Sequence, residues 1–200
     1  MGKKKIKYSI SSDEAEGANL PNKLGLKTQD EIEQAELEGF LYAYTILFDE
    51  LTEKTKFNLK YIFRIHKLAL GHLYSFAGKP RTVNLSKGGF MFPPAKFLNE
   101  SLKDFENGVL KILPADYTSK EELIKAIAKV HAELLFIHPF REGNGRTARL
   151  LANLMCAKAG YKLLDLENFS KEKFDNYIKA VQQAATGNYQ LMEKIISSLF

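Results

Sequence analysis

The 200-residue sequence predicts an all-α domain that carries one small β-hairpin flap. Apolar residues recur at helical spacing along most of the chain. Helix start signals precede these periodic stretches, and one short segment alternates as a strand does around a glycine turn. With 45% hydrophobic and 26% charged residues, the chain can fill the core of one ordinary domain and is not a disordered polyelectrolyte.

Residues that cap helix N-termini mark where each helix begins. An Asn cap, or a Ser/Thr–Glu capping box, satisfies backbone N–H groups that the first turn leaves open, and prolines mark helix ends. The predicted start signals, in chain order, are Thr28 with Glu31, Asn58, Pro93 with Pro94, Ser119 with Glu122, Ser170 and Asn188. Pro114 closes the third helix, predicted over 95–113, and the apolar stretch 147–159 predicts a buried helix.

Residues 81–92 break the helical pattern. Residues 81–85 alternate as a strand does, 87–89 supply a turn, and 90–92 predict a returning strand. A lone hairpin is marginal in water, so we expect this flap to lean on the helices. The predicted organisation is an N-terminal segment with a basic tail and a connector over 1–26, followed by the helical domain over 27–200.

The net charge of +5 is unevenly placed, because Lys3, Lys4, Lys5 and Lys7 supply four charges and leave 5 − 4 = +1 for the rest. Because the rest of the chain is nearly neutral, we expect no nucleic-acid partner. The apolar runs are far shorter than the roughly 20 residues of a membrane span, so we expect no membrane insertion. The single cysteine, Cys156, cannot form an internal disulfide, which favours a cytoplasmic location.

The most informative stretch is residues 138–149. Pro139 disfavours helical geometry at His138, so the preceding helix should end there. Gly143 and Gly145 permit backbone angles closed to other residues and allow a ligand to approach the main chain. A glycine turn that feeds a helix N-terminus presents open N–H groups and a positive dipole end, which favour an anion such as phosphate.

Two arginines interrupt the apolar helix that follows. Arg146 and Arg149 are three residues apart and therefore share a helix face. An unpaired charge there would cost several kcal/mol, so the pair indicates an anionic ligand with more than one phosphate. Zinc is the chemical alternative, since His138 and Glu142 can both bind metal, but Pro139 spoils their helical spacing.

These twelve residues resemble the signature of the Fic domain family, His-x-Phe-x-Asp/Glu-Gly-Asn-Gly-Arg-x-x-Arg, at every fixed position. Residues 76–84 resemble the flap region of the same family. The resemblance implies a Fic-type helical catalytic domain. It also implies transfer of AMP from ATP to a Ser, Thr or Tyr hydroxyl of a target protein, which can be the chain itself, with release of pyrophosphate.

Roles for single residues follow from this resemblance. His138 is implied as the general base that takes the hydroxyl proton, and Glu142 as the residue that holds Mg²⁺ on the phosphates. The implied phosphate-binding residues are Gly143, Asn144, Gly145, Arg146 and Arg149. In the family the flap adds a strand from the target, and the implied docking residues are Leu85, Ser86 and Lys87. A surface hairpin without this role is the alternative.

Residues 12–17 match the family's inhibitory pattern, Ser/Thr-x-x-x-Glu-Gly/Asn. The match implies that Glu16, preceded by Ser12, pairs with Arg149 and blocks productive ATP binding. The alternative is a polar, acidic segment without a function. A short, degenerate pattern of this kind is weak evidence by itself.

Three functions stay open at this stage. The first is protein adenylyltransferase. The second is an enzyme that uses the same site to transfer another phosphate-linked group or to remove AMP, and the third is a non-catalytic nucleotide-binding or partner-binding module. The intact Gly-Asn-Gly segment and the presence of His138 favour AMP transfer. Homo-oligomerisation stays open as well.

Overall fold

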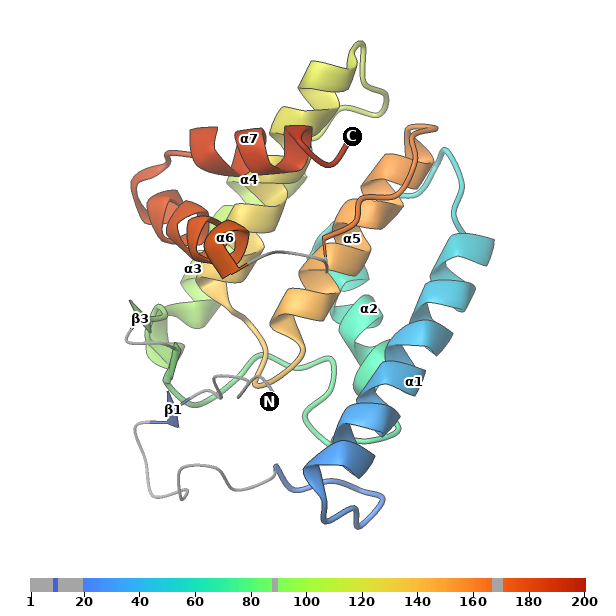
Figure 1. Ribbon diagram of the computed structural model, residues 1–200, viewed down its shortest axis with the longest axis vertical. Coiled ribbons are helices and arrows are strands. Elements are labelled where there is room, and N and C mark those ends of the chain that lie inside the picture. The colour runs from blue at the N-terminus through green and yellow to red at the C-terminus, as the bar shows by residue number, and fades with distance from the viewer. Residues whose placement is uncertain (1–8, 11–19, 88–89, 167–170) are drawn as a thin grey trace.

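The computed structural model describes residues 9–10, 20–87, 90–166 and 171–200. Within them the fold is helical with a small antiparallel sheet, as predicted (Figure 1). The α-helices are α1 (Gln29–Asp49), α2 (Leu59–Leu70), α3 (Leu98–Phe105), α4 (Lys120–Ile137), α5 (Asn144–Lys158), α6 (Lys171–Gln183) and α7 (Gln190–Ser197). The strands are β1 (Ser9–Ile10), β2 (Leu85–Lys87) and β3 (Phe90–Met91).

The predicted caps fix the starts of the long helices. Thr28 and Glu31 form a complete capping box on α1, and the Asn58 side chain caps α2. Ser119 caps α4 by accepting from the Glu122 N–H. The Glu122 carboxylate accepts from the N–H of residue 118 instead of Ser119, so the predicted box is only half formed.

The last two helices agree less closely with their predicted start signals. Asn188 accepts from the Gln190 N–H, but the N-cap of α7 is Tyr189, one residue later than predicted. Ser170, the predicted start of α6, lies outside the described residues.

The segment predicted as one helix over 95–113 contains three different types of helix in succession. A 3₁₀ turn (Ala95–Phe97) leads into α3, and a π-helical turn (Glu106–Leu110) follows it. The Glu106 carboxylate accepts the Leu59 N–H at 2.7 Å, which ties the start of this π turn to the start of α2. Wider turns of this kind arise where a helix adapts to a tertiary contact.

Helices α4 and α5 run through the middle of the molecule and are joined by a short loop at one end (Figure 1). Helix α4 packs against α3, α6 and α7, whereas α5 packs against α1 and α2. Helix α5 begins at Asn144, earlier than the predicted residue 147, because Gly143 takes a left-handed conformation and lets the helix start directly after it. The loop between the two central helices is residues 138–143, the first part of the predicted site.

The first strand of the flap is shorter than predicted, and the sheet has one strand more than predicted. Strands β2 and β3 pair antiparallel, with Ser86 opposite Met91, but residues 81–84 are not a strand. The Arg81 N–H donates to the Pro139 carbonyl at 2.8 Å, so this segment follows the central loop instead of a partner strand. The N-terminal strand β1 pairs with the other edge of β2, which gives the order β1-β2-β3. The sequence did not predict β1.

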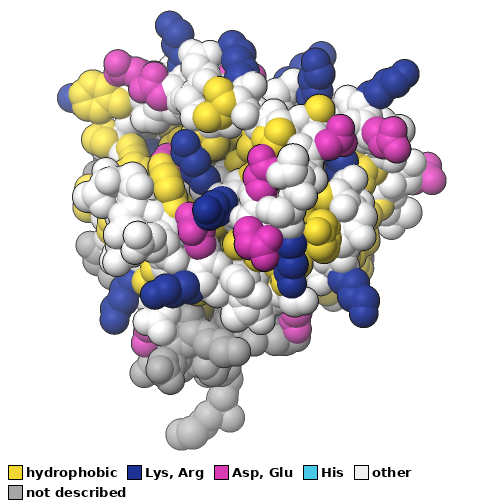
Figure 2. Space-filling view, turned by 90° about the horizontal axis from the view of Figure 1, so that it is seen from above, with side chains coloured by type: hydrophobic (Ala, Val, Ile, Leu, Met, Phe, Trp, Pro, Cys, Tyr) yellow, Lys and Arg dark blue, Asp and Glu magenta, His cyan; other side chains and the backbone are white. Residues whose placement is uncertain are grey.

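The described surface carries charges of both signs. On the face shown in Figure 2, lysines and arginines alternate with acidic side chains and do not gather into one basic patch. Across the described ranges, no helix combines the length and the apolar character needed to cross a bilayer.

Candidate active site

The loop between α4 and α5 is built on two left-handed residues. His138 ends α4 with φ 53°, and Gly143 precedes α5 with φ 77°. A Cβ atom at Gly143 would lie 2.7 Å from Leu70 Cδ1, so glycine is required there for space as well as for its backbone angle. Together the two residues turn the chain back, so that the end of α4 faces the start of α5.

His138 is held as a neutral imidazole with a defined tautomer. Its Nδ1 lies 2.9 Å from the Leu135 carbonyl, which can only accept, so Nδ1 carries the proton and Nε2 the lone pair. Burial lowers the pKa of His138 to about 3, and the positive charges of Lys87 and Arg81 act in the same direction. The ring stacks on Phe92 of the flap, with 3.8 Å between centroids. This is the protonation state that a general base requires.

The start of α5 has the character of an anion site. Among the described residues no side chain caps the helix at Gly143, so the first N–H groups are directed out of the helix end. Arg149 folds back over this turn, since its Nη1 lies 3.2 Å from the place of a Cβ at Gly145. The Asn144 side chain is buried and accepts from the Phe140 N–H (2.8 Å) while donating to the Phe140 carbonyl (2.7 Å). Asn144 therefore closes the loop with its side chain.

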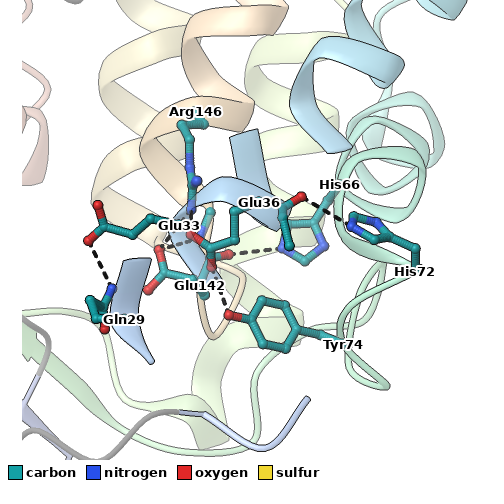
Figure 3. Close-up of polar contacts among 10 residues, drawn as sticks. Gln29, Glu33, Glu36, His66, His72, Tyr74, Glu142 and Arg146 are labelled. Carbon is teal, nitrogen blue, oxygen red and sulfur yellow. Dashed lines mark hydrogen bonds and ion pairs between the residues drawn. The ribbon is translucent and has the colours of Figure 1, made fainter. Parts of the chain in front are cut away.

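Arg146 is engaged by a carboxylate from a distant helix. Its Nη2 lies 2.7 Å from Oε2 of the buried Glu36 on α1, and 3.5 Å from Oε1 of Glu142. Tyr74 donates to the other oxygen of Glu36 at 2.8 Å. Figure 3 shows these side chains directed toward one another, with Glu36 between Arg146 and Tyr74. The guanidinium also lies over the Phe40 ring, 4.8 Å from its centroid.

Glu142 is the carboxylate that the sequence predicts as a magnesium ligand. Burial raises its pKa, and the Gly143 N–H, which donates to Oε1 at 2.8 Å, opposes this by stabilising the charged form. The side chain is 27% exposed at the edge of the helix terminus. Mg²⁺ is commonly held by one or two carboxylates together with substrate phosphates. A single, partly exposed carboxylate beside an anion site fits that chemistry.

His66 on α2 holds the loop from the inside. The Gly78 N–H donates to Nδ1 at 2.8 Å, so Nε2 carries the proton and donates to the Glu142 carbonyl at 2.9 Å. Burial lowers the pKa of His66 to about 4, which keeps the ring neutral. The imidazole also stacks on Phe140, with 3.9 Å between centroids. Phe140 is buried and packs inward.

Arg81 joins the flap to the same loop. Its buried guanidinium donates to the carbonyls of His138 (2.7 Å), Val83 (2.7 Å) and Pro93 (2.6 Å). A buried guanidinium stays charged, and carbonyl groups that accept from it offset the free-energy cost of burying that charge. Arg81 therefore fixes the entry and exit of the flap relative to His138.

No role was assigned to His66 or Glu36 from the sequence. A signal was present for each: both are polar residues on faces of helices whose other members are apolar, such as Ile32, Ala35, Ile62 and Ile65. A buried polar side chain needs a partner, and that partner can only come from elsewhere in the fold.

The predicted site residues from His138 to Arg149 lie together in the loop and the first turns of α5. Leu85, Ser86 and Lys87 form β2, next to His138 through Phe92. Ser12 and Glu16 lie outside the described residues. Their predicted role stays a prediction.

Comparison with known proteins identifies the family of the chain. The profile of the Fic/DOC family matches residues 56–156, which include α2, the flap, α4 and most of α5. The chain belongs to the Fic/DOC family.

Curated relatives of this Fic/DOC chain carry the name protein adenylyltransferase. "Protein adenylyltransferase Fic" of Drosophila willistoni is 29% identical over 152 residues, which are 76% of this chain and 30% of that protein. "Protein adenylyltransferase VbhT" of Bartonella schoenbuchensis is 28% identical over 193 residues, which are 95% of this chain and 39% of that protein. The chain thus spans between 30% and 39% of the length of these relatives.

Solved structures of similar fold include the BepC protein of Bartonella tribocorum with bound AMPPNP. Its TM-score is 0.73 at 22% identity, and the match covers 92% of this chain and 93% of that one. Fic-1 of C. elegans gives a TM-score of 0.66 at 25% identity and covers 88% of this chain and 52% of that one. The helical Fic fold with its small flap is therefore the fold of this protein.

Proposed function

We propose that this protein is an adenylyltransferase that transfers AMP from ATP to a Ser, Thr or Tyr hydroxyl of a protein, including its own chain. One observation carries the proposal: a neutral imidazole with its lone pair on Nε2 ends one central helix, and open N–H groups with an overlying guanidinium begin the next. A base beside a polyphosphate site is the arrangement that this reaction requires.

The proposed step is an in-line displacement at the α-phosphorus. The target hydroxyl oxygen forms a bond to this phosphorus, its proton passes to His138 Nε2, and the bond to the β-phosphate oxygen breaks. That oxygen leaves with the electron pair as part of pyrophosphate. Positioned proton transfer of this kind typically contributes a factor of about 10² to 10⁴.

The phosphates would lie against the start of α5. The N–H groups of Asn144 and Gly145 would receive the α- and β-phosphates, and Arg149 the terminal one. Arg146 would add its charge from the side, where Glu36 orients it. When bound, Mg²⁺ would be held by Glu142 and the phosphates and would neutralise charge on the leaving group.

The low pKa of His138 has a consequence for this proposal. An imidazole with a pKa of about 3 is unprotonated at neutral pH, but it is a weak base. The negative charge of a bound triphosphate favours the imidazolium, so nucleotide binding should raise the pKa of His138. Titration of the His138 ring by NMR, with and without a non-hydrolysable ATP analogue, measures this shift. An unchanged pKa would place the phosphates away from the ring.

We also propose that Glu16 restrains the enzyme by pairing with Arg149. Suppressing productive ATP binding a hundredfold takes about 2.7 kcal/mol, which one well-placed ion pair can supply. Glu16→Gly should raise AMP transfer, and Arg149→Ala should abolish it. If Glu16→Gly leaves both ATP binding and self-modification unchanged, this restraint is absent.

The test of the function is incubation of the full chain with Mg²⁺ and ATP that is radiolabelled at either the α- or the γ-phosphorus. Label from the α position on protein, lost in His138→Ala, supports AMP transfer. Label from the γ position alone would identify phosphorylation instead. No label from either nucleotide, even in Glu16→Gly, would favour a nucleotide-binding module.

A further inference from the structure

The middle strand of the flap sheet is paired on both sides. One edge of β2 pairs with β3, and the other pairs antiparallel with β1, where Ser9 lies opposite Ser86 and Ile10 opposite Leu85. Without β1, this second edge of β2 would present open N–H and C=O groups, which is the condition for adding a strand from another chain. The N-terminal segment therefore occupies an edge that could receive a second protein.

Ser86 and Leu85 are also residues that the sequence predicts to dock a target. We propose that residues Ser9–Ile10 are an intramolecular ligand of the flap edge, and that a target segment must displace them before it can pair with β2. The consequence for targets rests on the proposed function. The occupancy itself does not, because it is a matter of backbone pairing within the chain.

The geometry around β2 explains why this edge controls access to the base. The Phe92 N–H donates to the Leu85 carbonyl at 3.1 Å, and the Phe92 ring stacks on His138. Arg81 holds the chain on both sides of the flap to the His138 carbonyl. The β2–β3 pair is thus fixed beside the imidazole. Any strand added to β2 lies about 4.8 Å from it, whether it is β1 or a target.

Covalent connection favours the internal strand over an external one. Residues 11–28 are all that separate β1 from α1, so β1 stays near its edge at an effective concentration on the order of millimolar. A pairing of only two residues is weak in itself, however, so a target with further contacts can replace it. If β1 occupies the edge about 90% of the time, the apparent affinity of a competing strand falls tenfold.

The experiment opens the edge and offers the same strand from outside. Ser9→Pro/Ile10→Pro in the full chain removes both backbone N–H groups of β1. Both positions are changed because successive residues of a strand direct their N–H groups to opposite sides, so one of the two faces β2. The probe is a fluorescently labelled peptide with the native sequence of residues 3–14, and its binding is followed by anisotropy. We expect about tenfold tighter binding to the double-proline chain than to the native chain.

Two controls separate pairing from other effects. Ser9→Thr/Ile10→Val keeps both N–H groups and favours a strand, so it should bind the peptide as weakly as the native chain does. Arg149→Ala removes a proposed phosphate contact instead of a flap contact; it should abolish transfer and leave peptide binding unchanged, so loss of transfer and loss of docking are told apart. Amide hydrogen exchange at residues 85–87 should speed up only in the double-proline chain. Equal peptide affinity for the native and double-proline chains, or equal exchange at these amides, would overturn the proposal.

Discussion

The loop of residues 138–143 and the flap strands β2 and β3 lie next to each other, yet different interactions hold them. Buried side chains from distant parts of the chain fix the loop: His66 from α2 binds the Glu142 carbonyl, and Glu36 from α1 binds Arg146. The sheet is held by short runs of backbone pairing. Side-chain bonds of the first kind fix one geometry, whereas backbone pairing accepts any extended partner. The proposed phosphate site is thus held by fixed side-chain contacts, whereas the proposed partner of the flap would be exchangeable.

The first prediction tests, by lowering the pH, the part of the molecule that buried side chains hold together. Three buried imidazoles contribute: burial lowers the pKa of His66 to about 4, of His131 on α4 to about 4 and of His138 to about 3. Nearby positive charges act in the same direction, from Arg146 on His66, from Arg149 on His131, and from Lys87 and Arg81 on His138. The unfolded chain binds protons at these rings below about pH 6.5, so their stabilisation is present above that pH and is lost as the pH falls. Between pH 7 and pH 5 the free energy of unfolding should fall by about 2 kcal/mol for each imidazole.

Denaturant unfolding across this pH range measures the effect. His131→Gln should remove about a third of the pH dependence contributed by the three rings. His72→Gln is the control, because His72 is exposed and its Nε2 lies 3.1 Å from the Ala35 carbonyl at the side of α1. A slope that His131→Gln does not change would mean that this ring is not held neutral in the folded chain.

The second prediction breaks the connection between the two regions. Arg81→Met removes the buried donor to the carbonyls of His138, Val83 and Pro93, and should lower the free energy of unfolding by about 3 kcal/mol or more. Target transfer should fall further than ATP binding does, because the flap loses its position relative to His138. Arg64→Met is the control: its ion pair with Glu50 is exposed, so the cost should stay below about 1 kcal/mol. Similar costs for both variants would contradict the role of Arg81.

The third prediction concerns the inside of the loop. His66→Phe keeps the stacking on Phe140 but leaves the Gly78 N–H and the Glu142 carbonyl without their partner. We expect a loss of about 2 kcal/mol in unfolding free energy and a weaker affinity for Mg²⁺–ATP, because Glu142 is no longer fixed. Calorimetry and nucleotide titration measure the two effects. His72→Phe is the control. His72 lies close to His66 along the chain, and its replacement should change neither the free energy of unfolding nor the affinity for Mg²⁺–ATP.

These residues also show what can be predicted from the sequence and why the rest cannot. Local signals, such as the Thr28 capping box, the Asn58 cap and the glycine turn at 143–145, predicted the helices and the loop, because each acts within a few residues. The partners of His66, Arg81 and Glu36 lie 76, 57 and 110 residues away along the chain. No local pattern specifies such a pair, since it exists only after the helices have packed. Strand β1 was missed for the same reason.

The fourth prediction has the smallest expected effect and concerns how much of the site's charge is available to a ligand. Glu36 neutralises Arg146, and its charge also contributes to the raised pKa of Glu142. Glu36→Gln removes one negative charge beside the phosphate site while its amide oxygen still accepts from Tyr74 or Arg146. The repulsion of a bound triphosphate then falls by about 1 kcal/mol, so ATP should bind about fivefold more tightly.

Glu33→Gln, one turn away on α1 and bonded to Gln29, is the matched control and should change ATP affinity little. Weaker ATP binding in Glu36→Gln would mean that orienting Arg146 matters more than its net charge, and that Glu36 serves the phosphate site as a positioning residue.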